Sequence, residues 1–272
     1  MVRARRSLSQ NFLVDHNIRR KIVETLELDG SDEVLEVGPG HGELSELITG
    51  RVRRFVMVEK DDRLAPLLVE RWGTRDDVEV VHADALKIDL AGLVSGRHAL
   101  KLLSNVPYSI TSPLLFRFLD VPDVERIVVM VQEEVARRIC SNPGTRAYGA
   151  LTVGIQVQAR PRLAFRVGRA AFRPVPRVDS AVVVIEPRSE GPGAPDIAEV
   201  RVLARECFSR RRKQLQNILR SSPEYRLEAK QVQEILAGAG IEPAIRPEQL
   251  SPAAFVDLAR RISRHRPGKP AG

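Results

Sequence analysis

The sequence predicts an α/β protein, in which helices cover both faces of a parallel sheet, with a small helical domain after it. Three observations support this fold class. Short β-rich runs alternate with helical stretches through the first half of the chain, which is the order of βαβ units. A segment rich in proline and glycine, Pro187–Pro195, then has the composition of a linker. Beyond that segment the spacing of apolar residues becomes helical.

The first half contains five expected strands, each a short run rich in aliphatic and β-branched residues. They are Glu33–Val37, Phe55–Glu59, Val78–Val81, Lys101–Asn105 and Ile127–Gln132. The helical patterns between them are Glu43–Thr49, Arg63–Trp72 and Pro113–Leu119. The last of these helices is expected to use Ser112 as its N-cap and Pro113 as its first residue. Two further runs are expected to pair as antiparallel strands at the sheet edge, Thr152–Gln158 and Ser180–Glu186.

The C-terminal part shows three apolar faces at helical spacing. One contains Leu215, Ile218 and Leu219, and a second runs from Val232 to a stop at Gly240. A last helix is expected to begin at Ser251-Pro252. We therefore expect a large domain over residues 1–190, a helical domain over 196–265 and a flexible tail over 266–272.

The composition is that of a soluble protein. The 272 residues are 43% hydrophobic, and two cysteines, Cys140 and Cys207, are too few for a disulfide framework. The basic N-terminus lacks the apolar core of a secretion signal, and no apolar run is long enough to span a bilayer. These features predict a cytoplasmic protein without a membrane partner, and we expect a monomer without a metal site.

The net charge of +8 is concentrated in three regions. Six basic residues lie in 1–21, seven arginines in 160–188 and seven basic residues in 201–220. Clustered arginine indicates a phosphate-rich partner, because its guanidinium group forms paired hydrogen bonds with phosphate oxygens. The alternative is a solvated, arginine-rich surface.

A glycine-rich segment follows the first expected strand, E-V-G-P-G-H-G-E-L. Gly38 and Gly40 permit a tight turn and close approach to a ligand, and Glu59 ends the next strand, where an acid can accept both hydroxyls of a ribose. Glu43 stands where the dinucleotide fingerprint has glycine, and its charge would repel a pyrophosphate. A nucleoside cofactor without phosphates fits better, and S-adenosylmethionine is the common one. Asp84 can accept from an adenine amino group; the alternative is a turn or cap aspartate.

The fourth expected strand ends in N-V-P-Y, which suits methyl transfer to the exocyclic nitrogen of adenine. Two acceptors, the Asn105 side-chain oxygen and a backbone carbonyl at Val106 or Pro107, could draw that nitrogen toward tetrahedral geometry. Pro107 would fix the backbone, and Tyr108 would offer a ring on which the extruded base stacks. The alternative is a simple strand exit in which Asn105 caps and Tyr108 packs.

Several motifs occur together in an order that resembles the ribosomal RNA adenine N6,N6-dimethyltransferase family. They are S-Q-N-F-L, E-V-G-P-G-H-G-E-L, V-E-K-D, A-D-A-L, N-V-P-Y, V-Q-E-E-V-A-R-R and A-F-R-P-V-P-R-V-D-S. The resemblance covers about residues 7–262. It implies a Rossmann-like methyltransferase fold, S-adenosylmethionine as donor and transfer of two methyl groups to each target adenosine.

The resemblance also implies roles for individual residues. Asn11 and Leu13 would line the cofactor, Gly38 would lie beneath its methionine part, and Asn105 would join the cofactor and target sites. Phe172 would stack on the flipped adenine opposite Tyr108; the alternative is a core phenylalanine. Two positions depart from the family pattern, Val106 for leucine and Ser109 for asparagine, which leaves the shape of the pocket floor open.

The expected substrate is small-subunit ribosomal RNA, because C-F-S-R-R-R-K-Q-L-Q-N-I-L resembles the branch that modifies two adjacent adenosines in its 3′-terminal hairpin. Arg210, Arg211, Arg212 and Lys213 are consecutive, so we expect them to fan around a helix and meet backbone phosphates. Three alternatives remain: the large-subunit branch that confers macrolide resistance, a non-catalytic assembly factor, and an NAD-dependent oxidoreductase, against which Glu43 argues.

Overall fold

The computed structural model describes residues 11–96, 98–105, 107 and 110–265. Contacts divide the chain into two compact units. The first consists of Met1–Ala136 and Arg160–Pro187, and the second of Arg137–Ala159 and Arg188–Gly272. The third crossing between units falls after Pro187, where the predicted linker begins. The structure groups residues 137–159 with the C-terminal helices.

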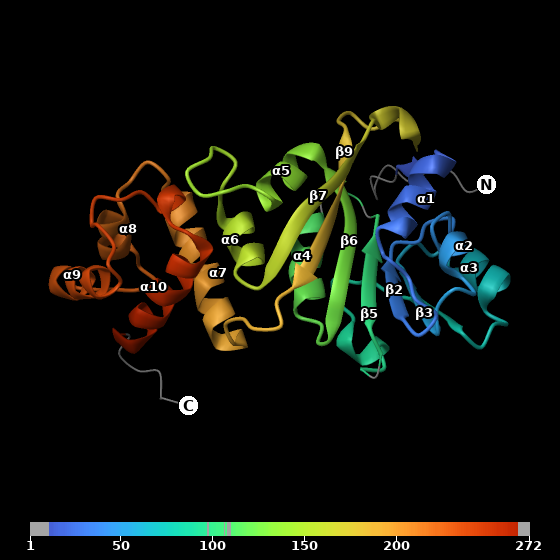
Figure 1. The fold of residues 1–272 in the computed structure, drawn as a ribbon, viewed down its shortest axis with the longest axis horizontal. Helices are drawn as coiled ribbons and strands as arrows, with labels where there is room; N and C mark the ends of the chain where they lie inside the picture. The colour runs from blue at the N-terminus through green and yellow to red at the C-terminus, as the bar shows by residue number, and fades with distance from the viewer. Residues whose placement is uncertain (1–10, 97, 106, 108–109, 266–272) are drawn as a thin grey trace. The chain divides into compact units, whose positions relative to one another are not determined.

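The first unit is built on a seven-stranded sheet, which Figure 1 shows with its strands side by side. The strand order is β4-β3-β2-β5-β6-β9-β7. The pairs β2–β3, β3–β4, β2–β5 and β5–β6 are parallel, and β6–β9 is antiparallel. The strand bounds are β2 Glu33–Val37, β3 Arg54–Glu59, β4 Val78–His82, β5 Leu100–Ser104, β6 Val124–Gln132, β7 Ala159–Val167 and β9 Ser180–Pro187. The five strands predicted for the first half are confirmed, within three residues at each end.

A separate two-stranded ribbon joins distant parts of this unit. Strand β1, Phe12–Leu13, pairs antiparallel with β8, Phe172–Arg173. The sequence predicted neither strand, because each has only two residues and no periodicity to detect. The ribbon brings the S-Q-N-F-L and A-F-R-P-V-P motifs together.

Helices of the first unit alternate with its strands, as predicted for βαβ units. Their bounds are α1 His16–Glu24, α2 Ser45–Ile48, α3 Ala65–Trp72 and α4 Thr111–Leu119, with 3-10 turns at Ala91–Leu93 and Arg169–Ala171. The predicted start of α4 was wrong. The helix begins two residues before Pro113 with Ile110 at the N-cap position, so Ser112 lies inside its first turn. Proline is tolerated there because the first-turn N–H groups have no partner within the helix.

The predicted strand at Thr152–Gln158 was also wrong. Residues Ala150–Gln156 form helix α6, and β7 takes the place beside β9 at the sheet edge. A short run of apolar residues cannot be assigned to strand or buried helix by periodicity alone. The other predicted edge strand is confirmed as β9, antiparallel to β6.

The second unit is helical. Its helices are α6, α7 Ala194–Ser209, α8 Leu215–Ser221, α9 Ala229–Gly238 and α10 Pro252–His265, with a 3-10 turn at Pro247–Gln249. Helix α5, Glu133–Ile139, runs from the first unit into the second. Helix α7 packs against α6 and α10 around a core that includes Leu203, Leu219 and Phe255. The Tyr148 hydroxyl donates to the Leu250 carbonyl at 2.8 Å inside this core.

Within the described ranges, no helix is both long enough and apolar enough to cross a bilayer.

Candidate functional site

The predicted site residues lie at one edge of the sheet, where the parallel strands end. Strand β2 has β3 on one side and β5 on the other, so the strand order reverses between β2 and β5. Ligands of open α/β sheets bind at the carboxyl ends of the strands on either side of such a reversal. Val37 pairs with Ser104 in the β2–β5 register, which places Gly38 and Asn105 next to each other on adjacent strand ends. The Ser104 hydroxyl donates to the Val37 carbonyl at 3.0 Å and fixes this junction.

The glycine loop after β2 requires glycine at its turns. Gly38 and Gly40 have φ values of 75° and 65°, a region that side chains disfavour. A Cβ on Gly40 would lie 3.2 Å from the Phe12 ring, so the loop and the N-terminal segment are in close contact. The Phe12 ring also packs against His41, with 4.4 Å between ring centroids. Phe12 thus lies against the glycine loop.

Glu59 ends β3 and ties the glycine loop to the next connection. Its Oε2 accepts from the Gly40 N–H at 3.1 Å and its Oε1 accepts from the Asp61 N–H at 2.7 Å. The side chain is 6% exposed, and this burial raises the pKa of Glu59 while the backbone hydrogen bonds oppose the rise. A carboxylate has about four acceptor positions. The Lys60 N–H also donates to this carboxylate, so only what Gly40, Lys60 and Asp61 leave open could take a ribose hydroxyl.

Asp84 follows β4, and Ala83 before it donates to the Glu59 carbonyl at 3.0 Å. The Asp84 Oδ1 accepts from the Leu86 N–H at 3.0 Å, and the Asp84 Oδ2 pairs with the Lys60 ammonium at 2.8 Å. The hydrogen bond from Lys60 lowers the pKa of Asp84, so the group is an ionised acceptor at neutral pH. The structure therefore shows a turn aspartate that also presents a charged acceptor at the site edge.

Asn105 directly follows β5 and is half-buried. The Pro107 carbonyl accepts from the Ile110 N–H at 3.1 Å and has one acceptor position left for a substrate. Val106, Tyr108 and Ser109 lie outside the described residues, so the proposed stacking by Tyr108 stays a prediction. The amine clamp at Asn105 stays a prediction as well.

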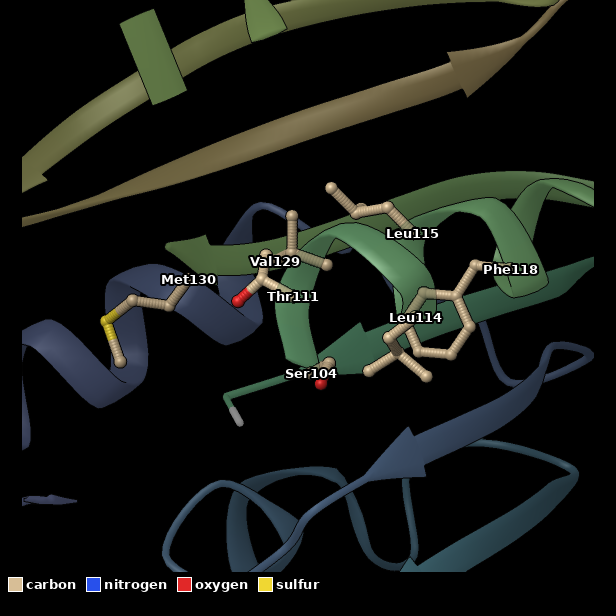
Figure 2. A pocket seen from close by; sticks show the side chains of 7 residues that line it. All are labelled: Ser104, Thr111, Leu114, Leu115, Phe118, Val129 and Met130. Atoms are coloured by element: carbon tan, nitrogen blue, oxygen red, sulfur yellow. The ribbon is translucent and has the colours of Figure 1, made fainter. Parts of the chain in front are cut away.

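Behind this strand end lies a narrow apolar pocket, which Figure 2 shows from close by. It is lined by Ser104, Thr111, Leu114, Leu115, Phe118, Val129 and Met130. The leucines and Phe118 project from α4 toward β5 and β6, and they anchor the start of α4 just after Asn105. The pocket is apolar and too narrow for water, so it serves packing.

Leu13 and Phe172 are placed differently from the expectation. They face each other in the β1–β8 register and are 2% and 1% exposed, within the core of the first unit. In this conformation the Phe172 ring packs as a core phenylalanine, and a stacking contact with adenine would require it to leave the core. Both proposed ligand contacts stay predictions. Asn11, just before β1, is half-buried.

Two groups near the loop were missed by sequence reasoning. Phe12 and His41 form the ring contact over the loop, for which the sequence offered no periodic signal. Glu36 is 1% exposed within β2 and accepts from the Ser45 hydroxyl at 2.6 Å. Burial raises the pKa of Glu36 to about 8, so it is mainly protonated at neutral pH. An acid inside a strand expected to be buried was a usable signal for this group.

The predicted RNA-binding run does not lie on a helix. Helix α7 ends at Ser209, and Arg210, Arg211, Arg212 and Lys213 occupy the turn before α8. The expectation that they fan around a helix was wrong. In the turn, two of the four side chains are bonded to the protein and two are exposed. Arg210 donates to the Ser221 hydroxyl at 2.8 Å and Arg211 to the Arg146 carbonyl at 3.1 Å. Arg212 and Lys213 are exposed.

The residues at this edge fit an adenosine-containing cofactor. The glycine turns leave backbone rather than side chains beside the strand ends, Glu59 keeps a free acceptor position, and Asp84 offers an ionised acceptor. Within the part of the chain that is described, no cluster of histidine, cysteine or acidic side chains could hold a metal ion.

In comparisons with known proteins, the family model and the similar sequences all concern ribosomal RNA methylation. A family model described as ribosomal RNA adenine dimethylase matches residues 1–263. The "Ribosomal RNA small subunit methyltransferase A" of Ligilactobacillus salivarius is 41% identical, over 94% of this chain and 88% of that protein. The proteins of the same name from Geobacter metallireducens and Pseudomonas aeruginosa are 41% and 37% identical, over 96% of this chain and 96% and 95% of theirs.

Two solved structures share the fold across both units. A dimethyladenosine transferase from Plasmodium falciparum is 24% identical with a TM-score of 0.79, over 93% of this chain and 98% of that chain. The 23S rRNA methyltransferase ErmE is 28% identical with a TM-score of 0.69, over 93% and 99%. With a family model that covers nearly its whole length and relatives at about 40% identity, the chain belongs to the ribosomal RNA adenine dimethylase family.

Proposed function

We propose that this protein transfers two methyl groups to N6 of each of two adjacent adenosines in the 3′-terminal hairpin of small-subunit ribosomal RNA. It does so with S-adenosylmethionine as donor, during assembly of the small subunit. The observation that carries the proposal is the pairing of Val37 with Ser104, which brings Gly38 and Asn105 together at the point where the strand order reverses. The end of β2 then binds the donor, and the end of β5 binds the target base.

The donor would be held by residues of three successive strand ends. Glu59 accepts from the ribose hydroxyls, Asp84 accepts from the adenine amino group, and the backbone at Gly38 supports the methionine part. Asn11 would line the donor next to Phe12, whose ring packs against His41 of the loop. When bound, S-adenosylmethionine supplies an electrophilic methyl group, and the protein supplies orientation.

Asn105 prepares the amine for attack. The N6 lone pair of adenine is conjugated into the ring, so the amine is a poor nucleophile. The Asn105 side-chain oxygen and a backbone carbonyl at Val106 or Pro107 accept the two N6 hydrogens and localise the lone pair. N6 would then be placed to attack the methyl carbon as the carbon–sulfur bond of the donor breaks, and one N6 proton would pass to solvent. Holding the two atoms in line can supply several kcal/mol, within the roughly 7–11 kcal/mol available to oriented reactions.

The substrate assignment is supported by the names of the relatives. Those at 37–41% identity are small-subunit methyltransferases, whereas the likeness to a 23S rRNA methyltransferase is at 28% identity. The exposed Arg212 and Lys213 in the second unit would bind backbone phosphates. We propose that the protein acts as a cytoplasmic monomer on immature small subunits.

A direct assay tests the proposal. Purified protein is incubated with radiolabelled S-adenosylmethionine and, separately, with small-subunit and large-subunit particles from cells that lack the protein. Digestion to nucleosides should yield N6,N6-dimethyladenosine from the small-subunit particle alone. Incorporation into large-subunit RNA would instead support the resistance-type activity. Absence of incorporation into either particle would support a non-catalytic assembly factor.

A further inference from the structure

The turn after Asp84 is held by bonds within itself and by side chains from outside, one of which is Lys60, paired with the Asp84 carboxylate. The Asp84 carbonyl accepts from the N–H groups of Lys87 and Ile88, at 2.8 and 3.0 Å. The Asp84 carboxylate accepts from the Leu86 N–H. These bonds leave the carbonyl groups of Leu86 and Ile88 pointing outward from the turn.

Arg117 meets both of these carbonyl groups. Its Nη1 donates to the Leu86 carbonyl at 3.2 Å, and its Nη2 donates to the Ile88 carbonyl. The planar guanidinium group presents donors in a fixed fork, which suits the carbonyl oxygens of two residues with one residue between them.

The position of Arg117 in the chain connects the Asp84 turn with the end of β5. Arg117 belongs to α4, which begins six residues after Asn105 and is anchored on β5 and β6 by the apolar face seen in Figure 2. The same helix is therefore fixed to the strand end that carries Asn105 and bonded to the turn that carries Asp84.

We propose that Arg117 is a positioning residue for the cofactor site, which holds the Asp84 turn in the geometry that accepts the adenine of the donor. The inference rests on the proposed function, because it takes Asp84 as the adenine acceptor. Arg117 touches neither donor nor target. It acts through the Leu86 and Ile88 carbonyls, and it links the turn that reads the cofactor to the helix behind the target base.

The first test follows the turn without any ligand. Hydrogen exchange is measured by mass spectrometry on peptides covering residues 84–90 in the wild-type protein and in Arg117→Met, which keeps side-chain length but loses both donors. Exchange of the Leu86, Lys87 and Ile88 amides should be at least about tenfold faster in the variant, a change of about 1.4 kcal/mol in the opening free energy. Unchanged exchange there would overturn the proposal.

The second test measures binding of S-adenosylhomocysteine, the demethylated product, by calorimetry. Arg117→Met should bind about tenfold more weakly, and Arg117→Lys, which can still donate to one carbonyl, should recover part of the loss. At saturating donor the turnover of Arg117→Met should stay within about threefold of wild type, because Asn105 is untouched. The weaker binding should instead raise the KM for the donor.

A matched control separates positioning from general stability. Arg126 on β6 also bonds a backbone carbonyl, that of Thr25 at 3.2 Å, and has no contact with the Asp84 turn among the described residues. Arg126→Met should lower the melting temperature and leave the affinity for S-adenosylhomocysteine unchanged. If Arg126→Met and Arg117→Met weaken binding equally, Arg117 is only structural. If the wild-type protein itself fails to bind S-adenosylhomocysteine, the proposed function fails while the exchange result still stands.

Discussion

Glu36 lies within the central strand β2, directly behind the glycine loop, and its carboxyl group is buried beside the Ser45 hydroxyl. Burial raises its pKa from 4.5 to about 8, and the neighbouring carboxylates of Glu43 and Glu59 add to the rise. A protonated Glu36 lowers the negative charge close to Glu59. The glycine loop thus has a mainly neutral carboxyl group at Glu36 behind it.

A pH-dependence of stability follows from Glu36. Between pH 4.5 and pH 8 the folded state keeps a proton that the unfolded state releases, so the free energy of unfolding falls as pH rises through this window. Glu36→Gln cannot titrate and can still accept from Ser45. Its stability relative to wild type should rise with pH, by up to about 1.4 kcal/mol per pH unit. Urea unfolding at pH 5, 6, 7 and 8 measures the difference, and a constant difference would show that Glu36 is ionised in the folded protein.

Asn105 is the residue on which catalysis depends in this account. Asn105→Ala should retain RNA binding and cofactor binding and lose methyl transfer, by on the order of 100-fold or more, since a preorganised acceptor at the reacting atom is removed. Asn142→Ala, an exposed asparagine of the second unit, is the control and should behave as wild type. Methyl incorporation into RNA, with binding measured separately, checks both. Near-normal turnover of Asn105→Ala would refute the amine clamp.

At the scale of elements, Gly42 is required for packing between the glycine loop and α3. Its φ is 83°, and a Cβ there would overlap the Trp72 ring, at 2.6 Å from Cζ3. Gly42→Ala should therefore cost about 2 kcal/mol or more, from backbone strain and overpacking together. Gly50→Ala has a similar φ of 79° with its nearest atom at 3.6 Å, and should cost only the strain. Chemical denaturation gives the free energy of unfolding of both variants. Equal losses of stability would show that the Trp72 ring adds no overlap penalty at Gly42.

The turn between α7 and α8 gives a prediction about RNA. Arg212→Gln/Lys213→Gln should weaken binding of the target hairpin and reduce the salt dependence of log K by about 0.7–0.9 per lost phosphate contact. Arg210→Gln removes a side chain bonded to Ser221 and should reduce stability more than it changes the salt slope. Titrations between 50 and 200 mM salt distinguish the two. An unchanged slope in the double variant would mean that these side chains are only a solvated surface.

The elements also show which features the sequence could reveal. Strands β2 to β6 were predictable because each is a short run rich in aliphatic and β-branched residues. Helix α6 was taken for a strand because Val153, Ile155 and Val157 alternate with polar residues or glycine, which is the period of a strand. Its helical state depends on packing against α7. Strand β7 was missed because exposed arginines interrupt its apolar residues.

The site was predictable where it depends on strand order and not where it depends on packing. Glu59, Asp84 and Asn105 follow consecutive strand ends, so their meeting at one edge follows from the parallel sheet. For Phe172 the sequence left a base contact and a core phenylalanine open, and the β1–β8 ribbon, which no local pattern reveals, places its ring in the core while the base contact stays a prediction. The Arg210–Lys213 run was assigned to a helix because the helix end at Ser209 carries no strong stop signal.

At the scale of the whole molecule, the chain combines a cofactor sheet in one unit with a basic helical unit. The net charge of +8 favours association with nucleic acid, and the family match extends through both units. A protein that only binds RNA would have no need of a buried carboxyl group at Glu59 beside the glycine loop or of the arrangement of Gly38 beside Asn105. The two units together therefore support an enzyme that positions RNA at a nucleoside-binding edge.

Primer extension on ribosomal RNA tests the central claim most directly. Reverse transcriptase stops at N6,N6-dimethyladenosine, because the two methyl groups block base pairing. In RNA from cells that lack this protein, the stop at the two adjacent adenosines of the small-subunit 3′-terminal hairpin should disappear, and it should return with the wild-type protein but not with Asn105→Ala. A stop that persists in the deleted cells, or that is lost from large-subunit RNA instead, would contradict the account.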